Sequence, residues 1–177
     1  MDIISEPLID CRILETKGLE DHRGAFIKTF HADAFSKLGL PVDWKEEFYS
    51  TSRKDVLRGM HFQLPPHDHD KLVYCIRGRV LDVLLDLRRG GDFGKTASVE
   101  LSAGNRRLLF IPKGIAHGFL ALEDDCVMVY KTTTVHAPTH DAGVHWRSFG
   151  FDWPIRDPII SVRDEGFPQF NEFASPF

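Results

Sequence analysis

The sequence predicts an all-β fold, either an antiparallel sandwich or a barrel. Three observations predict it. Apolar and polar residues alternate along the central part of the chain, turn-forming residues separate short apolar runs at near-regular spacing, and a single segment has a helical pattern. Strands of this kind each bury one face, so they are expected to pair into sheets that pack against one another.

The clearest alternation lies in residues 71–88. Asp82 and Asp86 alternate there with four apolar residues that share the other face, namely Leu81, Val83, Leu85 and Leu87. Gly78 lies at the centre of an Arg-Gly-Arg sequence and divides the segment. Because glycine accepts backbone conformations that other residues disfavour, we predict that the two halves form a hairpin.

Further elements follow from the same patterns. Strands are predicted at 97–101, 107–111, 118–122 and 127–131, where turn-rich separators bound short apolar runs. Residues 25–30 alternate like an edge strand that seeks a partner. Residues 32–38 predict a helix that ends at Gly39, a residue common after helices. From Phe167 onward the chain is aromatic and contains proline, so we expect an irregular tail that packs on the protein or on a partner.

Length and composition set limits on the class of protein. The 177 residues fit one domain, which we predict to span 1–177, and 42% hydrophobic with 27% charged residues exclude a largely disordered chain. A net charge of −4 argues against a nucleic-acid partner. The absence of a long apolar run or a signal pattern argues against a membrane partner and favours a cytoplasmic location. Cys11, Cys75 and Cys126 are interpreted as buried, reduced thiols.

One motif is similar to those of the cupins, small barrels that often hold a metal inside. Pro112-Lys-Gly-Ile-Ala-His117 matches the cupin pattern PxGxxH. Lys71, however, stands before Gly78 where a cupin has its metal-binding glutamate, and a cation there disfavours a metal. His67 and His69 form an HxH pair that lies too close to Lys71 for the metal pattern. We therefore predict no metal site, with a metal-dependent cupin enzyme kept as an alternative.

Longer motifs closely resemble the dTDP-4-dehydrorhamnose 3,5-epimerase family. They are LRGMHFQ and PP within 57–66, IPKGIAHGF at 111–119 and MVYKTT at 128–133, and the resemblance runs from about Leu19 to Phe170. It implies a cupin-like jelly-roll barrel or sandwich with a few short helices, a homodimer to which residues 1–45 contribute, and no cofactor. It also implies an isomerase that inverts C3 and C5 beside the C4 ketone of a dTDP-4-keto-6-deoxyhexose, as in conversion of dTDP-4-dehydro-6-deoxyglucose to dTDP-4-dehydrorhamnose.

The resemblance also implies catalytic roles. His61 matches the base that removes a proton next to the ketone, and Asp164 matches the carboxylate that hydrogen-bonds this histidine. Lys71 matches the cation that stabilises the enolate oxygen, and Tyr130 matches the acid that protonates the opposite face. From the spacing alone, Arg58 and His61 lie three residues apart and are expected on opposite faces of an extended segment.

The remaining matched positions are predicted to bind the substrate. Arg23 and Arg58 match residues that contact the diphosphate and nucleotide, and His117 matches a histidine near the carbonyl. The other predicted binding residues are Lys28, Glu46, Phe48, Gln63, Asp141 and Arg163. Several of these depart from the family pattern: Lys28 replaces a glutamate, Glu46 and Phe48 replace Gln and Asn, and Asp141 replaces a glutamate.

These departures leave alternatives open. The nucleotide could be CDP or GDP rather than dTDP, or a single centre could be inverted. A non-catalytic sugar-binding cupin is a further alternative, although the catalytic set is complete.

Overall fold

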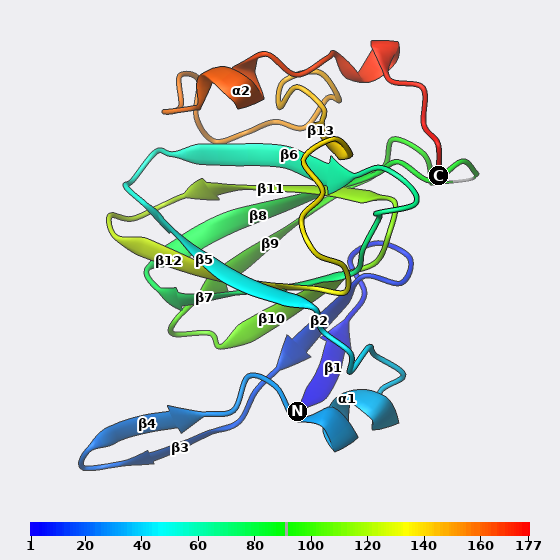
Figure 1. The fold of residues 1–177 in the computed structure, drawn as a ribbon. Helices are drawn as coiled ribbons and strands as arrows, with labels where there is room; N and C mark the ends of the chain where they lie inside the picture. The colour runs from blue at the N-terminus through cyan, green and yellow to red at the C-terminus, as the bar shows by residue number, and fades with distance from the viewer. Residues whose placement is uncertain (91) are drawn as a thin grey trace.

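In a computed structural model that describes residues 1–90 and 92–177, two antiparallel sheets pack face to face (Figure 1). One, which we call the β7 sheet, has the strand order β1 (Asp2–Ser5), β2 (Arg12–Glu15), β10 (Arg107–Ile111), β7 (Lys71–Arg77), β12 (Cys126–Thr132) and β5 (Glu46–Ser52). The other, the β6 sheet, has the order β13 (Asp141–Gly143), β6 (Leu57–Gln63), β11 (Ile115–Ala121), β8 (Arg79–Asp86) and β9 (Thr96–Ser102). The predicted all-β class is confirmed.

The predicted strands at 97–101, 107–111 and 127–131 are confirmed as β9, β10 and β12, within one residue at each end. The strand predicted at 118–122 begins earlier, as β11.

The predicted hairpin of residues 71–88 is wrong. The two strands exist, but β7 pairs with β10 and β12, whereas β8 pairs with β9 and β11 in the other sheet. At Gly78, with φ +75°, the chain leaves one sheet and enters the other, and a Cβ there would lie 2.6 Å from the sulfur of Cys126. Both strands are buried along most of their length, so each is stabilised more by two neighbours in its own sheet than by its sequence neighbour.

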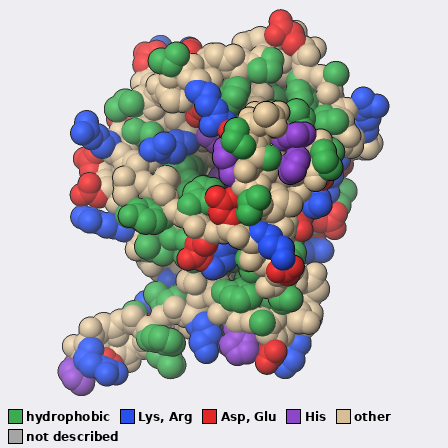
Figure 2. Space-filling model, viewed as in Figure 1, with side chains coloured by type: hydrophobic (Ala, Val, Ile, Leu, Met, Phe, Trp, Pro, Cys, Tyr) green, Lys and Arg blue, Asp and Glu red, His purple; other side chains and the backbone are tan. Residues whose placement is uncertain are grey.

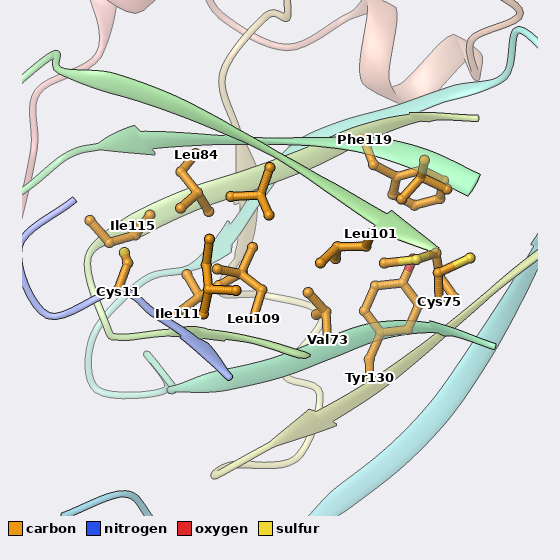
Figure 3. Close-up of a cluster of buried hydrophobic side chains, with 14 of the residues drawn as sticks. Cys11, Val73, Cys75, Leu84, Leu101, Leu109, Ile111, Ile115, Phe119 and Tyr130 are labelled. Carbon is orange, nitrogen blue, oxygen red and sulfur yellow. The ribbon is translucent and has the colours of Figure 1, made fainter. Parts of the chain in front are cut away.

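The main core fills the space between the sheets. Val73 of β7, Leu101 of β9 and Tyr130 of β12 point into it (Figure 3). Cys11, Cys75 and Cys126 are buried there as unpaired thiols, as predicted. Burial raises the pKa of Cys11 to about 12 and that of Cys75 to about 11, so both stay protonated at neutral pH.

Each sheet has a second apolar layer on its outer face. Helix α1 (Ala32–Lys37) places Phe35 against the β7 sheet, which confirms the predicted helix, and Gly39 follows with φ +70°. The C-terminal segment crosses the outer face of the β6 sheet (Figure 1). It contains the short helix α2 (Val162–Glu165), which the sequence pattern did not predict, and the 3-10 helix η1 (Phe170–Glu172). The aromatic tail packs on this layer, as expected.

Strands β3 (Gly18–Asp21) and β4 (Gly24–Ile27) form an antiparallel arm that projects from the body (Figures 1 and 2). The strand predicted at 25–30 therefore ends at Ile27. Leu19 and Phe26 on the arm are 74% and 63% exposed. No helix in the described ranges is both long and apolar enough to cross a membrane.

Candidate active site

A cavity of about 430 Å³ opens between the two sheets and is lined from both of them. Histidine side chains gather near hydrophobic and basic ones on the face shown in Figure 2. The cavity wall includes most of the residues predicted from the sequence, namely Glu46, Phe48, Arg58, His61, Gln63, Lys71, His117, Tyr130, Asp141 and Arg163. Asp164 lies behind His61, outside the wall.

Strand β6 carries both Arg58 and His61 into this cavity, which corrects the expectation that they lie on opposite faces. In the pairing with β11, His61 stands opposite His117 and Arg58 opposite Phe119, so three steps on β6 match two on β11. The extra residue is a β-bulge, which reverses the alternation between them. Gly59 has φ +138°, and a Cβ there would lie 2.5 Å from the Cα of Gly118.

His61 is paired with a carboxylate from the C-terminal segment. Its Nε2 lies 2.9 Å from Oδ1 of Asp164, and the other carboxylate oxygen accepts a hydrogen bond from the Gly59 N–H at 3.0 Å. Ser161 caps α2 by accepting from the Asp164 N–H, which fixes where this carboxylate lies. Burial raises the pKa of Asp164, but the His61 hydrogen bond and charge outweigh it and the pKa lies below its ordinary value. The carboxylate therefore stays ionised.

Burial also sets the state of the imidazole. Desolvation lowers the pKa of His61 more than the Asp164 carboxylate raises it, so the ring is neutral near pH 7. Because the carboxylate accepts from Nε2–H, the lone pair is on Nδ1. The ring is also held edge-on by Phe167, with centroids 5.7 Å apart. A neutral, oriented imidazole of this kind can act as a general base.

Lys71 begins β7 and extends its ammonium into the same space. Its Nζ donates a hydrogen bond to the His61 carbonyl oxygen at 3.2 Å. Burial lowers the pKa of Lys71 to about 8, although the carboxylates of Asp141 and Asp82 raise it. An ammonium that is only weakly solvated is a strong stabiliser for negative charge that develops beside it.

Tyr130 lies on the opposite sheet from His61. Its Oη is 3.0 Å from Oγ of Ser50, and its ring stacks on Phe48 with centroids 4.8 Å apart. Burial raises the pKa of Tyr130 well above its ordinary value, so the phenol stays protonated and can serve as an acid. Ser50 was missed in the sequence because a serine in an exposed strand carries no distinctive pattern.

His117 is held by a second buried carboxylate that the sequence did not single out as functional. Its Nε2 lies 2.7 Å from Oδ2 of Asp82, and both side chains are almost fully buried. The alternation predicts Asp82 on the polar face of a strand, but the structure buries its side chain in the protein. Desolvation raises the pKa of Asp82, against the lowering effect of His117.

The other predicted residues line the cavity and hold its loops. Asp141 and Arg163 form an ion pair at 2.8 Å, and the Arg163 guanidinium lies over the ring of Phe167. Gln63 accepts from the Ala137 N–H at 2.6 Å and donates to the His67 carbonyl at 2.7 Å, so it joins two loops. Arg58 donates to Oγ of Ser52 and the carbonyl of Thr51.

Arg23 and Lys28 do not lie with the other predicted residues. Arg23 is near the tip of the β3–β4 arm, where it bonds Asp21, and Lys28 lies beside His31 and Lys37 near α1. Neither lines the cavity of its own chain.

The histidine of the cupin motif, His117, and the HxH pair, His67 and His69, each have other partners. His117 is bonded to Asp82, His67 packs against His140 with centroids 4.4 Å apart, and Nδ1 of His69 contacts Gln63. In the described part of the chain, no group of three or more His, Cys, Asp or Glu could hold a metal ion.

Comparison with known proteins identifies the family. The family model described as dTDP-4-dehydrorhamnose 3,5-epimerase matches residues 5–172. The dTDP-4-dehydrorhamnose 3,5-epimerase of Escherichia coli K12 is 43% identical over 170 residues, which cover 93% of this chain and 92% of that protein.

Solved structures agree. The dTDP-6-deoxy-D-glucose-3,5-epimerase of Legionella pneumophila, in complex with dTDP-4-keto-L-rhamnose, superposes with a TM-score of 0.92 at 33% identity and covers 98% of this chain and 94% of that one. The dTDP-4-dehydrorhamnose 3,5-epimerase of Bacillus anthracis, with TDP and PPi bound, has a TM-score of 0.92 at 32% identity, covering 95% of this chain and 98% of that one. Since the match extends over nearly the whole sequence and fold, this chain belongs to the dTDP-4-dehydrorhamnose 3,5-epimerase family of isomerases.

Proposed function

We propose that this protein inverts C3 and C5 of dTDP-4-dehydro-6-deoxyglucose and so forms dTDP-4-dehydrorhamnose. One observation carries the proposal: the cavity places a neutral His61, paired with Asp164, on one sheet and a protonated Tyr130 on the other. Inversion at carbon needs a base and an acid that act on opposite faces of the substrate, and this arrangement provides both.

The proton and electron movements balance within the site. The C4 ketone acidifies the hydrogens on C3 and C5. Nδ1 of His61 takes one of them, the electrons of the C–H bond form the enolate double bond, and the carbonyl electrons move to the C4 oxygen. Lys71 stabilises that oxyanion. Tyr130 then gives its proton to the other face of the carbon: the enolate double-bond electrons form the new C–H bond and the oxyanion electrons re-form the C4 ketone. Exchange with water restores both side chains, so no net proton is consumed.

The charge around the cavity fits a nucleoside diphosphate. Arg58 and Arg163 line the wall, and guanidinium groups bind phosphate oxygens through paired hydrogen bonds. The relatives support thymidine as the nucleoside, because the Escherichia coli protein is named for a dTDP-linked sugar and the Legionella pneumophila structure contains one. A cytoplasmic location, where nucleotide sugars are made, is part of the proposal.

The proposal includes a homodimer. The β3–β4 arm exposes Leu19 and Phe26, and its strands pair with no other strand in the described part of the chain. Reaching into a neighbour's site would bury these residues and bring Arg23 to the substrate. A single chain thus supplies the base, the acid and the oxyanion cation, and the partner supplies part of the nucleotide site.

The reaction itself is the test. Proton NMR of dTDP-4-dehydro-6-deoxyglucose with the purified protein in deuterated buffer should show deuterium entering C3 and C5 and the appearance of dTDP-4-dehydrorhamnose. Exchange and inversion at C3 alone would show that a single centre is inverted. Binding without either exchange or product would contradict an enzymatic role.

A further inference from the structure

His69 lines the cavity two residues before Lys71, and the mechanism above gives it no role. It follows Pro66 in the loop that leads into β7. Its Nδ1 has hydrogen-bonding neighbours, whereas its Nε2 has none among the residues described. This difference determines whether the side chain can donate a hydrogen bond to a substrate.

The neighbours of Nδ1 determine which nitrogen carries the proton. The Gln63 amide is fixed because its oxygen accepts from the Ala137 N–H at 2.6 Å, so its nitrogen is the donor that lies 3.1 Å from Nδ1 of His69. Thr134 Oγ1, also 3.1 Å from Nδ1, has an acceptor of its own in the His67 carbonyl at 3.0 Å, so the Gln63 amide is the guide to the tautomer. A hydrogen on Nδ1 would face the amide hydrogens of Gln63 across 3.1 Å. We therefore assign Nδ1 as an acceptor and Nε2 as the nitrogen that carries the hydrogen.

The ring holds no second proton. Burial, together with the positive charges of Lys71, Lys113 and His136, lowers the pKa of His69 to about 3. The side chain is consequently a neutral N–H donor near pH 7, unlike the arginines and Lys71 that share the cavity.

Nε2 is buried and finds no hydrogen-bond partner among the residues described. Buried N–H groups are nearly always paired in folded proteins, so an unpaired one in a cavity wall indicates a ligand atom as its partner. A neutral donor suits a neutral acceptor, whereas the guanidinium groups suit the phosphates.

We propose that the Nε2–H of His69 donates a hydrogen bond to a hydroxyl oxygen of the bound hexose, at C2 or C3, and thereby selects sugars that carry it. This inference rests on the proposed function, because it takes the hexose to lie beside Lys71. A site built to pair with a substrate hydroxyl discriminates strongly against an analogue that lacks it.

Two substitutions of His69 by side chains of similar length distinguish the effect of the hydrogen bond from the effect of packing. His69→Gln keeps a neutral N–H donor, whereas His69→Met fills similar space without one. His67→Ala is the matched control, because its side chain packs on His140 and does not line the cavity. The probes are dTDP, dTDP-6-deoxyglucose and the 2-deoxy and 3-deoxy analogues of that sugar nucleotide. dTDP-6-deoxyglucose has a C4 hydroxyl in place of the ketone, so it binds without reacting.

Calorimetry should show that the wild type binds one deoxy analogue about tenfold more weakly than dTDP-6-deoxyglucose. His69→Met should lose this ratio, while His69→Gln and His67→Ala should keep most of it. Affinity for dTDP, which lacks the hexose, should change less than about twofold in every variant, because the nucleotide contacts are elsewhere. Thermal unfolding of each variant shows whether it is folded.

Three outcomes would overturn the inference. The wild type could bind both deoxy analogues as tightly as the parent, His69→Met could keep the ratio, or dTDP affinity could fall as much as sugar affinity, which would indicate a structural role. Failure of the proposed function is distinct: the wild type would then not convert the 4-keto sugar at all. NMR of the ring nitrogens gives an independent check, since Nδ1 protonation would also contradict the assignment.

Discussion

The pair formed by His61 and Asp164 joins residues about a hundred positions apart in the sequence, and under the proposed function it is the catalytic base with its supporting carboxylate. The carboxylate fixes the tautomer and stabilises the imidazolium that forms on proton transfer. Removing either member should therefore affect the same step, whereas removing Tyr130 should affect a later one.

We expect His61→Ala to abolish both deuterium uptake and inversion, because no enolate forms without the base. The loss should be about 10²–10⁴-fold. Tyr130→Phe should reduce inversion more than exchange, because His61 can still remove a proton and return deuterium to the same face. Proton NMR that follows exchange and product together measures both.

The control for Tyr130→Phe is Tyr49→Phe, since Tyr49 is 70% exposed and lies outside the cavity wall. It should exchange and invert at close to the wild-type rate. If His61→Ala exchanged deuterium at the wild-type rate while Tyr130→Phe did not exchange at all, the roles of base and acid would have to be reversed.

Two titrations should shape the pH profile of kcat/KM. The pKa of His61 lies below the ordinary histidine value of 6.5. The imidazole is therefore protonated, and unable to act as the base, only at a pH below 6.5. Lys71, with a pKa of about 8, loses its charge as the pH rises through that value, and enolate stabilisation is lost with it. Activity should therefore fall as the pH rises through about 8, whereas on the acid side it should persist below pH 6.5, the pH at which an ordinary histidine gains its proton.

The substitution Lys71→Arg tests the alkaline side of this profile. A guanidinium stays charged throughout this range, so the variant should be slower but should no longer lose activity near pH 8. An unchanged alkaline limb in steady-state measurements would mean that another group titrates there.

At the scale of elements, the β6 bulge decides which side chains of that strand reach the cavity. It depends on two facing glycines, because a Cβ on Gly118 would lie 2.7 Å from Sδ of Met60 and 2.8 Å from the carbonyl oxygen of Arg58. Gly118 does not have positive φ, so the effect of a substitution there is purely steric.

We expect Gly118→Ala to lower the free energy of unfolding by about 2 kcal/mol and to reduce kcat, since the bulge must shift to admit the methyl group. Gly104→Ala is the control, because its nearest contact would be 3.9 Å away at Ser102 Oγ; it should change stability by less than about 0.5 kcal/mol. Denaturant unfolding and steady-state kinetics measure the two quantities. Equal effects of the two substitutions would contradict the role given to the bulge.

For the whole molecule, the prediction concerns assembly. Sedimentation should give a dimer rather than a 20.2 kDa monomer across micromolar concentrations. Arg23→Ala alone should lower dTDP affinity and activity, although Arg23 lies far from the cavity of its own chain.

Mixing the weakened Arg23→Ala variant with the inactive His61→Ala variant tests where Arg23 acts. A dimer of Arg23→Ala with His61→Ala has one complete site if Arg23 reaches across, so random reassociation should recover about a quarter of wild-type activity. If Arg23 acted within its own chain, or if the protein were monomeric, the mixture would be no more active than the average of the two variants measured alone.

The sequence by itself determined the all-β class, the strands between residues 71 and 132, the helix after residue 31 and the motifs that identify the family. These are local properties, because alternation and turn residues act over a few neighbouring positions. Only the tertiary structure decided that β7 and β8 join different sheets, that a bulge turns Arg58 and His61 to one side, and that Asp82 and Ser50 hydrogen-bond His117 and Tyr130. Those features depend on contacts between strands far apart in the chain, whose energies no local pattern contains.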